Sequence, residues 1–370
     1  MISFLEKEIE NIPVINEDKR YWFIRTYGGE TFENYYDNKY VGLGINNVPV
    51  NLIKDARVIV KSPASFTEED NAYEILEDTK GNDVMENRSA FIRLWEHINQ
   101  NTSYHFGEAT KAAVQLVNFE NNIKIGDTVI IPSKNSSQIA IGTIESDVFS
   151  VRTPATFYFK NETHQYPIRR RRVKWERLID KKDLQGDFRG ITSRQGLTNI
   201  DYFKDIIDGT SKGLYIRNAH AYLTLKINQD QEINAFVLNR FLSGLTYFYQ
   251  EFCKESGREI DENLTIKIRL QSKGKMGIIG TIVVGVAGIS GMLHLGNRPD
   301  VRMEMGTYHS INASDSYMDF YNQFINHSPE RIQKAEEFNT SMQQLKAMNY
   351  LDSLPATEHD SSDETEIVGE

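Results

Sequence analysis

A β-hairpin signal at residues 126–144 constrains the fold of this chain more than any other feature of its sequence. Residues 128–131 are all β-branched, residues 133–137 are polar, and residues 138–144 return to an isoleucine-rich pattern. Two β-forming runs joined by a short polar segment predict a pair of antiparallel strands. The N-terminal half of the chain is therefore expected to contain a β-sheet.

Further β-forming and helical runs surround this hairpin. The elements predicted for this half are a strand at 20–27 that ends at Gly28-Gly29, a helix at 31–40, a strand at 41–45, a polar acidic loop at 61–87 with a helical start at 66–70, a helix at 91–119, and strands at 150–158 and 168–175. This mixture predicts an α+β fold.

The length of 370 residues predicts two domains, because single domains usually span about 100–200 residues. A glycine-rich and polar stretch at 186–213 places the expected boundary between residues 190 and 191. The second domain, residues 191–350, is expected to be a smaller α/β unit. Its predicted elements are a short helix at 202–207, strands at 221–227 and 264–270, helices at 232–255 and 329–348, and a glycine-rich apolar helix within 276–295.

The order of motifs in the N-terminal half resembles the PUA/EVE-like β-barrels found in modification-dependent restriction and other phage-defence proteins. An aromatic, arginine-containing strand ends in Gly28-Gly29 and is followed by the short run Val41-Gly42-Leu43-Gly44. Lys124-Ile125-Gly126-Asp127 leads into the hairpin, and a basic strand ends in Val173-Lys174-Trp175. The resemblance covers about 170 residues, and a helical insertion of about 80 residues separates the second strand from Gly126.

This resemblance implies a pocket for a flipped or free nucleobase, which needs aromatic faces for stacking and polar groups for the base edge. By position, Trp22, Arg25 and Thr26 at the end of the first strand would face the pocket, and Trp175 would stack from the last strand. Trp22 has an alternative interpretation as core, because aromatic residues on strands of small barrels are usually buried. A buried Arg25 would need partners for its guanidinium group.

Four consecutive arginines, residues 169–172, are the strongest charge feature. Because side chains alternate along a strand, Arg170, Arg172 and Lys174 should share one face. That face is predicted to contact the phosphate backbone of a nucleic acid. The alternative is an edge strand that its charges protect from aggregation. If one face of the strand packs against the core, some of these arginines are expected to have acidic partners.

Asp261 followed by Gln271-x-Lys273 suggests a metal-dependent nuclease of a modification-dependent restriction type, in which an acid and a Gln-x-Lys strand hold the metal. Nine residues between Asp261 and Gln271 leave room for one strand, whereas those groups normally lie on two neighbouring strands. The His residues show no metal-ligand spacing, and no zinc pattern, phosphate loop or nucleophile with a base is present. No cofactor or metal is predicted, and a non-enzymatic protein is favoured.

Residues 276–295 carry no formal charge and are long enough to cross a bilayer as a helix. Thr281/Gly285 and Ala287/Gly291 have the spacing of small residues at which membrane helices pack closely. A membrane is therefore one expected partner, and a pore would require a homo-oligomer. The alternative is a buried glycine-rich segment of an α/β domain.

Charge, cysteine content and the N-terminal sequence predict a disordered tail, a buried thiol and a cellular location. Residues 351–370 hold seven acidic residues and no Lys or Arg, which predicts a disordered tail; without it, 42 basic residues face 45 acidic ones. The single cysteine, Cys253, lies in an apolar pattern and is expected to be a core thiol. With no signal-peptide pattern at the first residues, the expected location is the bacterial cytoplasm or the inner membrane.

Three functions follow from these features. The first is a sensor of a nucleobase, nucleotide or nucleic acid, set in antiviral defence by the resemblance, whose segment 276–295 acts on a membrane. The second is the nuclease, and the third is a soluble, non-enzymatic nucleic-acid-binding protein.

Overall fold

The chain forms two compact units. The computed structural model describes residues 7–57, 59–60, 73–74, 82–181, 196–228, 232–258, 264–269, 274–298, 300–304, 307–310 and 316–349. Asp18–Ile206 forms one unit, the barrel unit, and Met1–Glu17 joins Ile207–Glu370 in the other, the α/β unit. This division differs from the predicted boundary at 190/191, because β11 (Leu197–Asn199) pairs with the first strand of the barrel unit, and the N-terminal segment pairs with a strand of the α/β unit.

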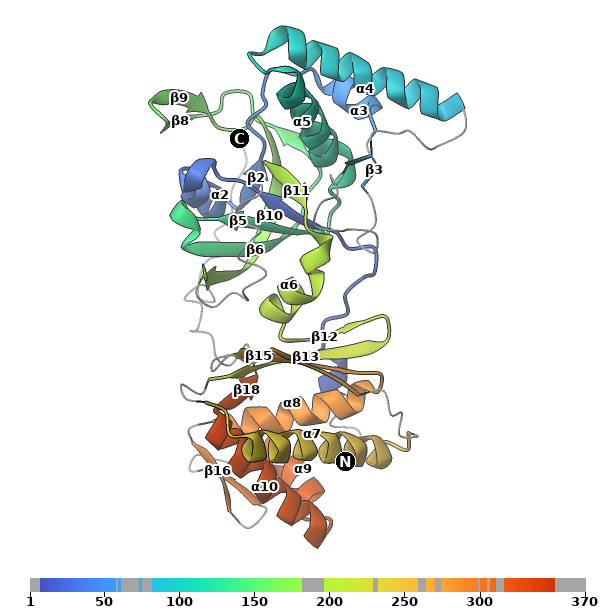
Figure 1. Ribbon diagram of the computed structural model, residues 1–370, viewed down its shortest axis with the longest axis vertical. Coiled ribbons are helices and arrows are strands. Elements are labelled where there is room, and N and C mark those ends of the chain that lie inside the picture. Colours follow the sequence, from blue (N-terminus) through green and yellow to red (C-terminus); the bar gives the residue numbers. More distant parts are fainter. Residues whose placement is uncertain are drawn as a thin grey trace, which may run out of the picture. The chain divides into compact units, whose positions relative to one another are not determined.

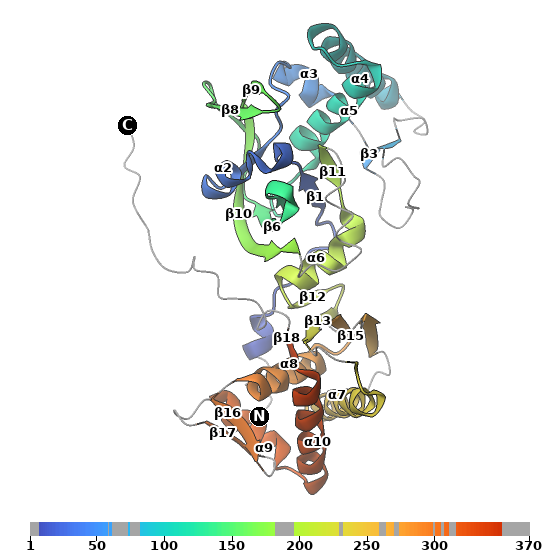
Figure 2. The same cartoon turned by 60° about the vertical axis from the view of Figure 1, so that its left-hand side comes forward.

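The barrel unit is built on a curled sheet that forms half of a barrel (Figures 1 and 2). Its path runs β11-β1-β5-β6-β10-β2, and β7 also pairs with β10. The strands are β1 (Tyr21–Ile24), β2 (Tyr40–Gly42), β5 (Thr128–Pro132), β6 (Gln138–Ile144), β7 (Phe149–Ser150), β10 (Arg169–Asp180) and β11. The predicted hairpin is confirmed as β5 and β6, with Thr128 opposite Thr143 and Pro132 opposite Ile139.

Strand β10 is responsible for much of the curl. Its first residues, Arg169–Arg172, pair with β7 and β2, and its later residues pair with β6 up to Asp180. The register shifts between Trp175 and Arg177, which marks a β-bulge that bends the strand and increases its twist. One long strand therefore serves two parts of the sheet.

A separate two-stranded flap consists of β8 (Thr156–Phe159) and β9 (Glu162–Gln165). Lys160 and Asn161 connect the two strands, and both have positive φ angles, 50° and 65°. Two such residues are typical of a tight type I′ hairpin turn. The predicted strand at 150–158 is thus divided between β7 and β8.

Three helices, at residues 50–55, 82–101 and 106–117, gather at one end of the barrel unit (Figure 1). The described helices are α2 (Phe32–Asp37), α3 (Val50–Asp55), α4 (Asn82–Asn101) and α5 (Phe106–Val117), with a π-helical turn at Asn118–Asn122 directly after α5. The single helix predicted at 91–119 is two helices, because the backbone N–H of His105 donates to the Glu108 carboxylate at 3.0 Å and starts a new helix there. The short strand β4 (Tyr73–Glu74), inside the predicted loop at 61–87, pairs with β3 (Ile59–Val60) just before it, while the predicted helical start at 66–70 lies outside the described residues.

The α/β unit packs helices on one face of an antiparallel sheet (Figure 1). The strands are β12 (Leu214–Arg217), β13 (His220–Ile227), β15 (Gly274–Gly280) and β14 (Thr265–Arg269) in that order, with β18 (Ala347–Asn349) beside β13; the hairpin of β16 (Val301–Glu304) and β17 (Thr307–Ser310) is separate. The helices are α6 (Lys204–Ser211), which begins in the barrel unit, α7 (Ala235–Glu255), α8 (Val283–Asn297), α9 (Ser316–Ile325) and α10 (Pro329–Leu345). Alternate residues of β13, including Leu223 and Leu225, are buried in the shared core.

The apolar segment 276–295 is a strand followed by a helix, and not the single helix that its length and composition predict. Its first five residues pair with β13 and β14 in the sheet, and α8 begins at Val283. Helix α8 lies in the core, where a Cβ on Gly285 or Gly288 would meet the rings of Tyr249 and Phe252 from α7 at 2.5 and 2.4 Å. Its glycines thus let α7 pack closely. Over the ranges that the structure describes, no helix has both the length and the apolar character to cross a membrane.

Candidate functional site

The two faces of β10 differ sharply. Arg169, Arg171 and Val173 are buried, Arg170 is half-buried, and Arg172 and Lys174 are exposed. The predicted alternation of the arginine run is therefore confirmed. It separates the arginines that hold the fold together from the cations available to a partner.

Arg171, only 2% exposed, holds the π-helical turn after α5. Its guanidinium donates to the carbonyl oxygens of Phe119 at 2.9 Å, Glu120 at 3.1 Å and Ser146 at 3.0 Å. The last carbonyl groups of a helix have no hydrogen-bond donor within the helix, and a cationic side chain can donate to them instead. Burial lowers the pKa of Arg171, and nearby carboxylates, first that of Asp147, oppose this shift.

Arg169 is satisfied in the same way, by the carbonyl oxygens of Ile45 and Val48. The expectation that some of these arginines have acidic partners is met by Arg171 alone of the two buried ones. Among the described residues its carboxylate partner is Asp147, which lies 4.0 Å away and is 93% exposed. The carbonyls that accept from Arg169 and Arg171 belong to three chain segments, at residues 45–48, 119–120 and 146.

We call Arg170, Arg172 and Lys174, on the side of β10 away from the core, the outward cations. The two arginines among them lie next to aromatic rings. The Arg170 guanidinium is 4.1 Å from the centre of the Tyr40 ring, and its Nε donates to the Pro167 carbonyl at 2.8 Å. The guanidinium of Arg172 lies 5.4 Å from the centre of the Phe149 ring. Burial raises the pKa of Tyr40 to about 12, although the charge of Arg170 opposes the rise. Both guanidinium planes are thus oriented by stacking while part of their surface faces solvent.

A cluster of half-buried rings lies between the flap and the turn after β1. We call it the flap cluster, and it consists of Tyr27, Phe157, Phe159, His164 and Tyr166. The ring centres of Tyr27 and Phe157 are 5.1 Å apart, those of Phe157 and His164 are 5.6 Å apart, and those of Phe157 and Tyr166 are 4.8 Å apart. Burial raises the pKa of Tyr166 and the charge of Arg170 opposes it, so the cluster lies within electrostatic reach of β10.

The position of Tyr27 depends on a glycine. A Cβ on Gly44 would lie 1.7 Å from the Tyr27 hydroxyl, so only glycine fits there. Tyr27 itself has a φ of 50°, a conformation that a bulky residue adopts only when its surroundings enforce it. The second glycine of the run Val41-Gly42-Leu43-Gly44 therefore serves to seat a ring of the flap cluster.

The four residues predicted to bind a base do not form one pocket wall. Trp22 and Thr26 are buried: the indole N–H of Trp22 donates to Asp127 at 3.0 Å, and the Thr26 hydroxyl donates to the Pro132 carbonyl. Arg25 is exposed at the end of β1. Trp175 is half-buried and stacks on Tyr36, with ring centres 5.7 Å apart and an angle of 25°. The alternative interpretation of Trp22 as core matches its position.

Asp127, the last residue of the Lys-x-Gly-Asp motif, is a structural hub. Besides the indole of Trp22, its carboxylate accepts the backbone N–H groups of Arg20 and Lys124 at 3.0 and 2.9 Å. Burial raises the pKa of Asp127, and these hydrogen bonds oppose the rise. The motif thus ties β1 to the start of the hairpin.

A polar recess of about 510 Å³ lies beside the π-helical turn. It is lined by Arg20, Trp22, Arg57, Glu120, Asn121, Asn122 and Lys124. Its cations already contact protein oxygens: Arg20 pairs with Asp201 at 2.6 Å, and Lys124 donates to the Asn121 carbonyl at 2.8 Å. We therefore rank this recess below the β10 face as a site for an anionic ligand.

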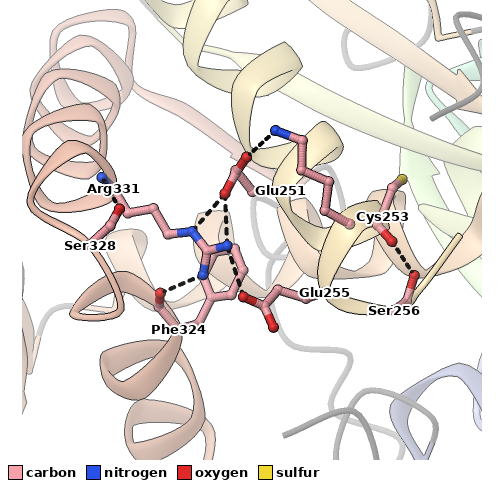
Figure 3. Close-up of polar contacts among 8 residues, drawn as sticks. Glu251, Cys253, Glu255, Ser256, Phe324, Ser328 and Arg331 are labelled. Carbon is pink, nitrogen blue, oxygen red and sulfur yellow. Dashed lines mark hydrogen bonds and ion pairs between the residues drawn. The ribbon is translucent and has the colours of Figure 1, made fainter. Parts of the chain in front are cut away.

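A buried polar cluster of the α/β unit is structural (Figure 3). Arg331, 5% exposed, donates to Glu251 and Glu255 of α7 at 2.8 Å each and to the Phe324 carbonyl at 3.1 Å. Cys253 is buried nearby, and burial raises the pKa of its thiol to about 11, which makes it a poor nucleophile. The cluster joins α7, α9 and α10.

The nuclease residues Asp261, Gln271 and Lys273 lie outside the described residues. Among those that are described, no group of His, Cys, Asp or Glu is arranged to hold a metal ion. The three predicted nucleic-acid contacts, Arg170, Arg172 and Lys174, do share one side of β10.

Sequence reasoning missed the flap cluster. The available signal was the pair of short β-forming runs at 156–159 and 162–165, joined by Lys160-Asn161, in which aromatic residues and His164 recur. Recognising this hairpin would have placed several rings on one small ribbon, next to the arginine run.

Comparisons with known proteins add one finding. Residues 70–195, which include α4, α5, the hairpin and β10, match a family model described as a domain of unknown function (DUF8426). The search of curated proteins found no match for the chain.

Proposed function

We propose that the barrel unit binds nucleic acid through the outward face of β10 and the flap cluster. The observation that carries this proposal is that exposed Arg172 and Lys174 share one side of β10 with half-buried Arg170, which lies over the Tyr40 ring and whose charge opposes the rise in the pKa of Tyr166 in the flap cluster. Cations neutralise phosphates, and aromatic faces stack on bases. Sequence-tolerant binding of single strands uses this combination.

The flap supplies the exposed part of such a surface. Tyr158, on the opposite side of β8 from Phe157 and Phe159, is 64% exposed, and the Lys160 ammonium lies 5.5 Å from the Phe159 ring. Stacking on an aromatic ring contributes about 1–3 kcal/mol per base. The acidity of the whole chain does not oppose this, since seven acidic residues belong to the tail at 351–370.

The resemblance to PUA/EVE-like barrels supports the same proposal and extends it. The barrel unit is built on a curled half-barrel sheet, and the resemblance adds a modified base as the ligand and phage defence as the setting. The flap cluster, rather than Trp22 and Thr26, would then supply the stacking faces.

A membrane-acting role for segment 276–295 has less support. Helix α8 is packed against α7, α9 and α10, and most of its side chains are buried there. To reach a bilayer, α8 would have to leave this core, and segment 274–280 would have to leave the sheet. We therefore favour a binding protein whose α/β unit remains folded.

The test is fluorescence anisotropy with labelled single-stranded DNA, double-stranded DNA and RNA, at several salt concentrations. Arg172→Ala/Lys174→Ala should weaken binding at least tenfold and reduce the salt slope by about 0.7–0.9 per lost phosphate contact. Lys54→Ala/Lys111→Ala, which removes two exposed cations from α3 and α5, is the matched control and should leave the affinity and the salt slope unchanged. Equal loss in both variants, or no binding by the intact chain, would refute the proposal.

A further inference from the structure

The polar recess beside the π-helical turn has the size and the side chains of a small-ligand site. Its volume of about 510 Å³ lies within the range of about 300–1,000 Å³ that such sites usually have. Its lining consists of Trp22, of three cations, Arg20, Arg57 and Lys124, and of three polar residues of the turn, Glu120, Asn121 and Asn122. This lining suits a polar ligand that carries negative charge.

The π-helical turn is fixed by contacts on its backbone and on its side chains. Arg171 donates to the carbonyls of Phe119 and Glu120, and the Asn121 Nδ2 donates to those of Ile53 and Ala56 at the end of α3, at 2.9 and 2.8 Å. The Asn121 Oδ1 accepts no hydrogen bond from the described residues and, unlike the Glu120 Oε2, is not buried away from solvent. Such turns are rare in proteins and frequently lie at functional sites.

Two cations are tied to Asn121, which places their charged groups at the recess. The Lys124 Nζ donates to the backbone carbonyl of Asn121 at 2.8 Å. The Arg57 Nη1 donates at 2.9 Å to the Ala56 carbonyl, the same oxygen that accepts the Asn121 Nδ2. Both residues are exposed. An ammonium has three N–H groups and a guanidinium has five, so these contacts leave donors on each cation for a ligand.

The charges around the recess leave a positive excess. Arg20 is balanced by Asp201, which its Nη1 contacts at 2.6 Å. Burial lowers the pKa of Arg169 and the charge of Glu120 opposes this, so the Glu120 carboxylate faces a buried cation. Within the part of the chain that the structure describes, the two exposed cations of the recess form no ion pair. Their charges are therefore available to an anion.

We propose that this recess binds a phosphomonoester whose organic part carries hydroxyl or amino donors, as a nucleotide or a sugar phosphate does. Arg57 and Lys124 hold the phosphate group, because a guanidinium can donate two parallel hydrogen bonds to it and an ammonium adds a point charge. The Asn121 Oδ1 accepts from a donor of the organic part, for which the recess has room beyond the phosphate. This site does not rest on the nucleic-acid proposal for β10.

The proposal is tested by isothermal titration calorimetry of the full chain. The probes are inorganic phosphate, the four ribonucleoside 5′-monophosphates, ribose 5-phosphate and glucose 6-phosphate, each ester beside its dephosphorylated counterpart. At least one ester should bind at least tenfold more tightly than its counterpart and than inorganic phosphate, and its identity distinguishes a nucleotide from a sugar phosphate. Equal binding of the counterpart or of inorganic phosphate overturns the proposal, and so does the absence of binding by every ester at millimolar concentration.

Variants locate the site. Arg57→Gln/Lys124→Gln should weaken ester binding at least tenfold, whereas Arg93→Gln/Lys111→Gln, at exposed positions of α4 and α5, is the matched control and should not change it. Lys124→Glu reverses one charge and should weaken binding further than loss of that charge alone. Unchanged affinity in Lys124→Glu, with the chain folded by circular dichroism, would overturn the proposal even if the double variant failed to fold. The nucleic-acid titration is a separate measurement with other variants, so the two proposals fail independently.

Discussion

The two units bury an arginine in opposite ways. In the barrel unit, Arg171 donates to three backbone carbonyls. In the α/β unit, Arg331 donates to one carbonyl and pairs with two carboxylates, those of Glu251 and Glu255, whose side chains are 12% and 28% exposed. The first arrangement closes the end of a helix, and the second joins three helices. The comparison shows that backbone carbonyls can accept the hydrogen bonds of a buried guanidinium in place of carboxylates.

Because of this difference, the two arginine clusters should respond differently to pH. The carbonyl partners of Arg171 do not titrate, but the partners of Arg331 do. Burial raises the pKa of Glu251, yet hydrogen bonds from Lys254 and Arg331 outweigh burial and hold that pKa below its ordinary value of 4.5. The Arg331 cluster should therefore weaken in acid, while the Arg171 contacts should not.

The largest effect is expected from Arg171→Met, which keeps most of the apolar stem and removes the donors. Three carbonyls, that of Phe119 in a buried bond and those of Glu120 and Ser146 in partly buried ones, would lose their donor. Each unsatisfied buried group costs about 1–3 kcal/mol, so we expect a loss of about 3–5 kcal/mol in the free energy of unfolding. All three tryptophans, Trp22, Trp95 and Trp175, lie in the barrel unit, so urea unfolding followed by tryptophan fluorescence reports this change. A loss below 1 kcal/mol would mean that water or other donors satisfy the turn.

A smaller loss, about 2–4 kcal/mol at pH 7, is expected from Arg331→Met, because its two carboxylates are partly exposed and can be hydrated once the charge is gone. Faster hydrogen exchange in peptides of α7, α9 and α10 would localise the loss to the α/β unit, while the unfolding transition followed by tryptophan fluorescence, which reports on the barrel unit, should change less. Arg171→Met should instead shift the tryptophan transition and leave the hydrogen exchange of α7, α9 and α10 unchanged.

The same variant tests the pH argument. Because the folded-state pKa of Glu251 is lowered, its contribution is complete above pH 4.5 and is lost as the pH falls through the lowered value. The difference in stability between the intact chain and Arg331→Met should therefore shrink between pH 5 and pH 3. A constant difference over this range would assign the effect of Arg331 to packing against Phe324 instead of charge.

Sequence alone predicts those parts of the fold that rest on local pattern. The hairpin at 126–144, the alternation of β10 and helix α7 follow from periodicity, which each segment carries by itself. The partners of Arg169 and Arg171 do not, because they are carbonyls of segments about 25–125 residues away, and every residue type offers a carbonyl.

The same limit applies to the candidate site and to segment 276–295. The outward cations of β10 were predictable from alternation, whereas the flap cluster depends on a ribbon that folds back to Tyr27. For segment 276–295, the uncharged composition describes a membrane helix and a buried strand-helix pair equally well. The pairing of β15 with β13 and β14, and the packing of Gly285 and Gly288 against α7, distinguish these arrangements.

The smallest effect on stability is expected from Arg172→Met, the neighbour of Arg171 on the opposite face of β10. The Arg172 side chain is exposed. Its hydrogen bond to the Ser146 hydroxyl is made by the backbone N–H, so the bond is kept in the variant. The free energy of unfolding should therefore change by less than about 0.5 kcal/mol, while nucleic-acid affinity falls. Urea unfolding and anisotropy on one protein sample measure both. If stability fell as far as in Arg171→Met, the two faces of β10 would not be distinct, and the strand would have to be regarded as structural throughout.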